Sequence, residues 1–439
     1  MGTIPLQKRH RQQAAQRYEV DRSANRARLY LLAFLWPFAA AVIAVLRPRA
    51  PEARNLMWIF VVFYGAVFYI AAGSGSDSVR YAQNLMVMHQ DWFGLSQLTS
   101  QFFAEGSRYQ DIYQPLVTFF VSRLTDQYWL LFAAFGVLFG YVYSRNIWFL
   151  VDRIEGRAGL LMVFLVLSYA FVLGIGPGLN GVRMWTALHV FVFGFLHYYA
   201  TGNRKFLLVI LLSPLIHFSF WLPVGVLFGF FFVKAFGLPI YGFFLVSYVA
   251  SWIDLAAVQT LMSYLPLQLE QRSSGYIGLA EMRQDGMVEV GGESAWFLGL
   301  NASLRPWFFL LMVSWMVWRG CLLKSGLVRN LLVFGMLMYG VVNMLSYIPS
   351  LGRFYSLAGM LLLAAVILWL AEAKRPRAKD RQIVAALASL LFIHLALGVR
   401  MTMEWASIWL LAGNFLVAPF VSADSNLYEF LAPFVRFLI

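Results

Sequence analysis

Long apolar stretches alternate with short polar connections along almost the whole chain. Several of them, such as 158–174 and 354–371, have the ~17–25 apolar residues that a helix needs to cross the hydrocarbon core of a bilayer. We expect crossings at 29–46, 56–72, 127–143, 158–174, 182–200, 238–258, 299–318, 331–348, 354–371, 383–399 and 404–420. The pattern therefore predicts an all-α, polytopic integral membrane protein with about eleven transmembrane helices.

Two long polar segments interrupt this pattern, at 73–126 and 259–298. The second segment is acidic, so we expect both to be extracytoplasmic, with an amphipathic helix at 112–124 lying along the outer interface. The predicted organisation is a basic N-terminal leader (1–28), a single transmembrane domain (29–420) and a C-terminal tail (421–439).

The composition and charge agree with this class. Hydrophobic residues make up 61% of the sequence and charged residues only 13%, about half the charge of a soluble domain. The net charge is +13, but the basic residues gather in short connections that the positive-inside rule places in the cytoplasm. Membrane lipids are therefore the expected surroundings, and nucleic acid is not an expected partner. The connections are Arg145–Arg157, Asn203–Lys205, Arg319–Arg329 and Lys374–Arg381.

The segment 206–233 does not fit as a single crossing, because basic connections lie at both of its ends. Two arms of ~14 residues reach roughly 21 Å each, which is less than the ~30 Å core. We expect a re-entrant hairpin, with its first arm broken at Ser213-Pro214 and His217 close to the turn.

The leader conflicts with the count of crossings. That count puts the N-terminus outside, whereas the positive-inside rule prefers a basic leader inside. Either the leader is an exception, or the segment 29–46, which is interrupted at Trp36-Pro37, does not fully cross. The basic residues of the leader are Lys8, Arg9, Arg11, Arg17, Arg22, Arg26 and Arg28.

Motifs for metals and cofactors are absent from the sequence. The single cysteine, Cys321, excludes an internal disulfide and a cysteine-based metal site, and its basic neighbours place it in a cytoplasmic turn. HExxH, P-loop and Rossmann fingerprints do not occur, and four histidines show no ligand-like spacing. We expect neither a metal nor a cofactor. These histidines are His89, His189, His197 and His394.

Asp77, Arg80 and Tyr81 directly follow the predicted second crossing. On a helix that begins at Ser76 or Asp77 they share one side. They could form only a helix cap with a local ion pair. Alternatively, Asp77 orients or deprotonates a sugar hydroxyl.

A second polar motif is Asp111-Ile-Tyr-Gln-Pro115. Asp111 could simply cap the helix that Pro115 helps to start. In the functional alternative, Tyr113 and Gln114 bind carbohydrate by stacking and hydrogen bonding.

A glycine-rich turn, 174–181, leads through Asn180 to Arg183 at the start of an apolar helix. Such a turn can present backbone N–H groups to an anion, and Arg183 adds a planar, bidentate donor. Gly194 lies eleven residues later, on the same helical face. The alternative is an arginine whose side chain reaches the lipid headgroups. We favour phosphate binding, because Arg183 is not on the basic side.

The fourth motif pairs His217, at the inferred hairpin turn, with Arg353 of Gly352-Arg353-Phe-Tyr355. A single histidine is usually a satisfied core residue, but a histidine at a re-entrant turn more often has a function. Arg353 is on the same side and at the same depth as Arg183. Two such arginines suit a diphosphate ligand.

At these residues the sequence resembles the EpsG-like branch of Wzy-type polysaccharide polymerases, within the broader set of lipid-linked (GT-C-like) glycosyltransferases. The resemblance covers roughly residues 29–371. It rests on the order and spacing of Asp77–Tyr81, Asp111–Pro115, Asn180–Arg183, His217 with Ser219, and Gly352–Tyr355.

The resemblance implies a metal-independent enzyme of the bacterial inner membrane with its active site facing the periplasm. Such an enzyme moves a growing glycan from undecaprenyl diphosphate to a sugar hydroxyl of the next lipid-linked repeat unit. Arg183 and Arg353 would then bind the diphosphate, and His217 or Asp77 would activate the hydroxyl. The other expected substrate-binding residues are Arg80, Tyr81, Asp111, Tyr113, Gln114, Asn180 and Tyr355.

Three partners are implied in the same way: the lipid-linked oligosaccharide, a chain-length regulator and a flippase. An O-antigen-ligase-like transferase would use the same parts and stays an alternative. A transporter or flippase of lipid-linked sugars is an alternative from another class, although we find no paired halves in the sequence.

Overall fold

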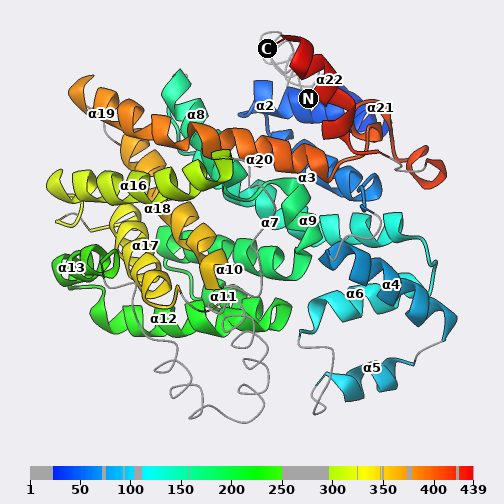
Figure 1. Cartoon of the computed structure of the whole chain (residues 1–439), viewed down its shortest axis with the longest axis horizontal. Helices are drawn as coiled ribbons and strands as arrows, with labels where there is room; N and C mark the ends of the chain where they lie inside the picture. Colours follow the sequence, from blue (N-terminus) through cyan, green and yellow to red (C-terminus); the bar gives the residue numbers. More distant parts are fainter. Residues whose placement is uncertain are drawn as a thin grey trace, which may run out of the picture.

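The computed structural model of the chain describes residues 23–71, 76–91, 94–102, 111–156, 158–249, 296–323, 325–346, 348, 351–372, 378–421 and 425–438. These residues form helices, with two isolated β-bridges between short extended segments (Figure 1). The predicted all-α class is therefore confirmed for the described part of the chain.

The helices follow one another along the described parts of the chain. After a helical segment at 23–35, the first half contains α2 (Pro37–Leu46), α3 (Ala53–Ala66), α4 (Asp77–Gln90), α5 (Leu95–Gln101), α6 (Tyr113–Ser122), α7 (Tyr128–Val151), α8 (Leu160–Ala170), η1 (Phe171–Leu173), α9 (Ile175–Asn180), α10 (Val182–Thr201), α11 (Lys205–Ile216) and η2 (Phe218–Phe220). The second half contains α12 (Trp221–Val233), α13 (Gly237–Ser247), α16 (Trp296–Trp318), α17 (Leu327–Met344), η3 (Leu351–Arg353), α18 (Phe354–Glu372), α19 (Ala378–Ala388), η4 (Ser389–Leu391), α20 (Phe392–Glu404), α21 (Trp409–Ala412), η5 (Ala418–Phe420) and α22 (Leu427–Leu438).

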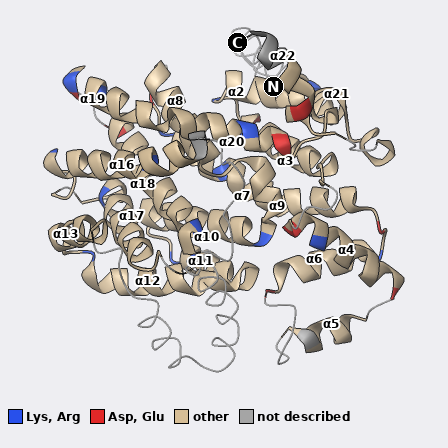
Figure 2. Ribbon diagram, viewed as in Figure 1, with Lys and Arg blue, Asp and Glu red and all other residues tan. Residues whose placement is uncertain are grey.

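Six helical stretches in the described residues are long and apolar enough to cross a membrane. They are Tyr128–Val151, Leu160–Asn180, Gly299–Trp318, Leu327–Met344, Leu351–Glu372 and Ala378–Glu404. Large apolar side chains also face outward: Leu208, Phe228 and Phe232 are each more than 60% exposed. Charged residues interrupt the helices rarely (Figure 2). These are the features of a membrane protein, because a soluble surface does not carry continuous apolar area of this kind.

Several of the predicted crossings and connections are wrong. The segment 404–420 is not a crossing: α20 ends at Glu404, and the chain then forms β-bridges from Ala406 to Phe68 and from Ser407 to Asn426. These bridges satisfy backbone groups that a helix would otherwise pair internally. In addition, α7 continues to Val151, so Arg145 lies in a helix and not in a connection.

The N-terminal part folds back on itself at Trp36-Pro37. Trp36 leaves the helical region, and Pro37 starts α2 without a backbone donor. Arg26 forms an ion pair with Glu52, and Leu29 lines the same small pocket as Arg47. Leu29 and Arg47 are 18 positions apart in the sequence, and in one straight helix they would be separated by ~27 Å. Of the two alternatives, the structure therefore favours a segment that turns back.

We use the term basic end for the connections 47–52, 152–159, 202–204, 234–236 and 319–326. Hydrogen bonds join several of them. Arg49 donates to the carbonyl oxygens of Ile154 and Gly156, and Arg329 donates to those of Lys234 and Ala235. At the other end, α4, α5 and α6 lie together at one edge of the molecule (Figure 1, lower right).

The segment 206–233 consists of two short helices that meet at His217, which has an extended backbone. The predicted break at Ser213-Pro214 is wrong, because α11 continues through Pro214 to Ile216. Proline has no N–H for the Ile210 carbonyl oxygen, but the Ser213 hydroxyl donates to that oxygen at 2.6 Å. The helix therefore ends at the histidine and not at the proline.

Close packing of α10 on α11 sets the position of His217. A Cβ atom on Gly194 would lie 2.6 Å from Cγ1 of Ile210 and 2.9 Å from the carbonyl oxygen of Phe206. The absence of a side chain at Gly194 thus lets the two helices cross in contact. Gly194 lies on the same face of α10 as Arg183, as the sequence predicts, and its role there is to allow close packing against α11.

Candidate functional site

Arg183 lies at the start of α10 and bonds to two other elements. Its Nη1 is 3.1 Å from Oδ2 of Asp111, and its Nε donates to the Tyr81 hydroxyl at 3.2 Å. The Arg183 side chain is 26% exposed, whereas Asp111 is 1% exposed. Because a guanidinium has five N–H donors, several donors of Arg183 remain outside these two bonds.

Asp111 joins the start of α6 to the turn at His217. Its Oδ1 accepts the backbone N–H of Phe218 at 2.7 Å, and the N–H of Ile112 donates to the Leu215 carbonyl oxygen at 3.1 Å. No side chain caps the N-terminus of α6, so the capping alternative for Asp111 is wrong. The carboxylate caps the distant η2 turn instead and also neutralises Arg183.

His217 is buried at this turn and paired with Ser219. Its Nδ1 accepts the backbone N–H of Ser219 at 3.3 Å and lies 2.7 Å from the Ser219 hydroxyl oxygen. A backbone N–H can only donate, so Nδ1 carries the lone pair and the proton of the neutral ring is on Nε2. His217 is therefore arranged as a hydrogen-bond donor through Nε2.

Asp77 and Arg80 form an ion pair on α4, with the Asp77 side chain 22% exposed. The Asp77 charge is close enough to act on both Tyr81 and Arg183. Asn180 accepts the backbone N–H of Ser78 at 3.1 Å and so ties α9 to the start of α4. Asp77 therefore forms the expected local ion pair with Arg80 and also lies near Arg183.

Tyr81 connects α4 to Arg183. Burial raises the pKa of the Tyr81 phenol to about 12. Its hydroxyl therefore stays neutral at physiological pH. The oxygen accepts a hydrogen bond from Arg183, and the O–H can donate a hydrogen bond to another acceptor.

Arg353 is exposed at η3, and its charge, like that of Arg183, reaches His217. The next residues lead into a second polar chain: Tyr355 donates to Asn343 at 2.7 Å, and Asn343 donates to Ser247 at 2.8 Å. Phe354, the residue after Arg353, packs against Phe220 of η2 with ring centroids 5.3 Å apart, so Arg353 lies near the His217 turn. Tyr355 is held by α17 and faces into this chain of bonds.

Gln114 is buried within the bundle, and Tyr113 is half-buried. The Tyr113 hydroxyl is buried near Thr186, and Gln114 donates to Thr118 at 2.9 Å on the same helix. The glycine-rich turn is largely buried as well, because Gly176 packs against Tyr64 and Trp405, and Gly178 packs against Phe139. Gln114 and the turn therefore present no open surface to a sugar or an anion.

We call Asp77, Tyr81, Asp111, Arg183 and His217 the polar cluster. Its members come from α4, the segment just before α6, α10 and the α11–η2 turn. Segments far apart in sequence therefore meet at the end away from the basic connections. The order of motifs does not reveal that Asp111 holds the Phe218 backbone. The signal that the sequence offers is the position of Asp111, directly before the predicted amphipathic helix at 112–124. In the described residues, no group of three His, Cys, Asp or Glu side chains is arranged to hold a metal ion.

The comparisons with known proteins give no match: no family model, no curated protein and no solved structure is similar to the chain. The function must therefore be argued from the site.

Proposed function

We propose that the chain is a polysaccharide polymerase, a lipid-linked glycosyltransferase of the bacterial inner membrane with its site facing the periplasm. The observation that carries this proposal is the contact of Arg183 with Asp111 and Tyr81 beside His217. Polar groups of this kind are costly in a membrane protein, so their convergence favours a function. The motifs that resemble the polymerase family are the same residues.

The proposed topology places the basic end in the cytoplasm. Besides the six long helices, α10 has 20 residues and reaches ~30 Å, enough for a crossing. The shorter α3 and α13 are proposed as further crossings, and α11 with α12 as the re-entrant pair. The polar cluster then lies on the periplasmic side.

Arg183 is proposed to bind the diphosphate of the donor lipid. Asp111 and Tyr81 fix the plane of the guanidinium, and its remaining N–H groups can hold phosphate oxygens bidentately. The exposed Arg353, whose charge also reaches His217, supplies a second positive group. Asp111 is a positioning residue in this scheme, because both of its carboxylate oxygens accept bonds from the protein.

His217 is proposed to donate through Nε2 to the leaving diphosphate, since Nδ1 is occupied by Ser219. Asp77, which is partly exposed, is the better candidate for the base. In the transfer step the acceptor oxygen bonds to the anomeric carbon as the bond from that carbon to the diphosphate oxygen breaks. The bonding pair leaves with the diphosphate, and the hydroxyl proton passes to Asp77.

The experiment uses the purified full chain in proteoliposomes with an undecaprenyl-diphosphate-linked oligosaccharide. A ladder of longer glycans with release of undecaprenyl diphosphate supports the polymerase. Transfer only after addition of a different glycan acceptor favours the ligase. Movement of the lipid-linked sugar across the bilayer with no new glycosidic bond favours the flippase and contradicts the proposal.

A further inference from the structure

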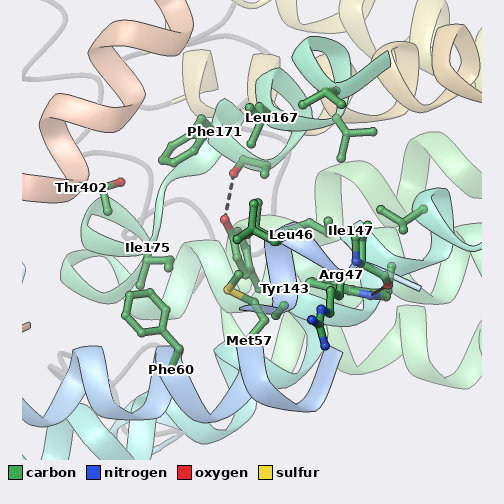
Figure 3. A pocket seen from close by; sticks show the side chains of 18 of the residues that line it. Leu46, Arg47, Met57, Phe60, Tyr143, Ile147, Leu167, Phe171, Ile175 and Thr402 are labelled. Atoms are coloured by element: carbon green, nitrogen blue, oxygen red, sulfur yellow. Dashed lines mark hydrogen bonds between the residues drawn. The ribbon is translucent and has the colours of Figure 1, made fainter. Parts of the chain in front are cut away.

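A large apolar cavity lies apart from the polar cluster, between α2, α3, α7, α8 and α20. Its volume is about 870 Å³, within the roughly 300–1,000 Å³ of typical small-molecule sites. Arg47 lies at one end of the lining, and Phe171 and Ile175 lie toward the other (Figure 3). None of the residues of the polar cluster lines it.

The lining of this cavity is mostly apolar, and its Tyr143 and Thr402 hydroxyls are already paired. The Tyr143 hydroxyl donates to the Ala170 carbonyl oxygen at 3.3 Å, and the Thr402 hydroxyl donates to that of Gly398 at 2.9 Å. A hydrocarbon fits such a lining, whereas a sugar or a peptide would leave its own polar groups unpaired.

The cavity is open sideways. Val45, Leu46 and Val163 line it and are at the same time exposed, at 53%, 74% and 42%. They belong to α2 and α8, which are apolar helices in the proposed bilayer region. A hydrocarbon chain can therefore enter from the surrounding lipid without passing through water.

The mouth at the basic end carries positive charge and a fixed shape. Arg47 and Arg49 belong to the lining, which contains no carboxylate. Arg49 donates to carbonyl oxygens of the connection 152–159, and the Trp148 indole donates to the Pro48 carbonyl oxygen at 2.8 Å. In the described part of the chain Arg47 has no ion-pair partner. An anionic headgroup is the complement of this mouth.

We infer that this cavity is a binding site for an anionic phospholipid from the leaflet at the basic end. Its acyl chain fills the space between α2 and α8, and its phosphate contacts Arg47 and the free N–H groups of Arg49. The inference is independent of the proposed polymerase activity, because the site shares no residue with the polar cluster.

The test titrates the detergent-solubilised full chain with dioleoyl phosphatidylglycerol or dioleoyl phosphatidylcholine and measures the melting temperature. A ligand that binds only the folded state raises this temperature. We expect phosphatidylglycerol to stabilise the wild type more than phosphatidylcholine. Arg47→Gln should lower the affinity for phosphatidylglycerol about five-fold, the effect of one basic residue at an anionic surface. Arg204→Gln, at an exposed basic-end arginine outside the cavity, is the matched control.

A photoreactive acyl chain on phosphatidylglycerol gives the second readout. Labelled peptides should come from α2 and α8, and Val166→Trp, which fills the cavity, should remove the labelling. Several results would overturn the inference. These are equal stabilisation by the two phospholipids, equal behaviour of Arg47→Gln and Arg204→Gln, full stabilisation by inorganic phosphate alone, or tighter binding of undecaprenyl phosphate. A change from monomer to dimer that blocks labelling would assign the cavity to a second copy.

Discussion

Two arginine–aspartate ion pairs, one at each end of the molecule, look alike at first. Arg183 and Asp111 are 3.1 Å apart, with side chains 26% and 1% exposed. At the basic end, Arg319 and Asp380 are 2.8 Å apart, with side chains 25% and 7% exposed. Length and burial therefore do not distinguish a functional pair from a structural one.

The surroundings of the two pairs differ. Asp111 also holds the Phe218 backbone, and Arg183 also bonds to Tyr81, so four segments depend on one another. Arg319 and Asp380 join only α16 to α19, and Nε of Arg319 makes no hydrogen bond to a described residue. A pair that fixes the orientation of both partners suits a site, whereas a single contact between two helices suits stability alone.

Asp111→Ala should have the largest effect on both stability and activity. The change leaves Arg183 and the Phe218 N–H without their acceptor, and breaking a buried ion pair costs about 3–5 kcal/mol. Denaturation of the purified variant, followed by glycan synthesis, checks both effects. Asp380→Ala is the control and should cost about 1–3 kcal/mol with activity retained. Equal loss of activity in the two variants would contradict the distinction.

Arg183→Lys should lower the polymerisation rate about 10²–10³-fold, because lysine keeps the charge but cannot form two parallel hydrogen bonds. Arg319→Lys should leave the rate near that of the wild type. Initial rates of glycan elongation at saturating donor lipid provide the measurement. Near-normal synthesis by the Arg183→Lys variant would remove the bidentate argument.

His217→Gln should retain more activity than His217→Ala, because the glutamine amide can still donate a hydrogen bond. We expect a loss of about 10²-fold for alanine, in the range of one transition-state donor, and a smaller loss for glutamine. Donor-lipid binding, measured separately, should persist in both variants. If glutamine and alanine are equally inactive, His217 acts as a base and not as a donor.

Gly194→Ala should have the smallest effect. The added Cβ would meet Ile210 and the Phe206 carbonyl oxygen, which pushes α11 away from α10 and shifts His217. Overpacking of this kind costs about 1–3 kcal/mol. Gly229→Ala, where a Cβ meets nothing within 4 Å, should instead leave stability unchanged or raise it slightly. Thermal unfolding of both variants, with the activity of each, separates the two outcomes.

The pattern of apolar residues predicts the long apolar helices well, because each of them depends on its own composition. The positions of α10, α16 and α18 follow the expected ranges within a few residues. The failures lie where partners distant in the sequence decide. Ala406 and Ser407 form bridges that the local sequence does not encode, and Ser213 compensates for Pro214 inside α11.

The sequence also reveals which residues belong to the candidate site, but it does not reveal which partners they contact. Asp111, Arg183 and His217 stand out because charged and polar groups are rare between apolar runs. Their partners do not stand out, because Phe218 contributes only a backbone N–H, which every residue except proline has. The burial of Cys321 likewise depends on packing, so a topology experiment needs a cysteine at the exposed Leu323 instead. The expected extracytoplasmic segment 259–298 lies mostly outside the described residues.

The bond from Phe218 to Asp111 spans 107 residues and the bond from Arg183 to Asp111 spans 72. Closing such long loops is slow and entropically unfavourable until the helices between them are in place. During synthesis, α4 and α6 therefore emerge well before the groups that will hold them. A nascent chain that ends before Phe218 lacks the donor that fixes Asp111, so the polar cluster must assemble late, after α10 and α11 have been inserted.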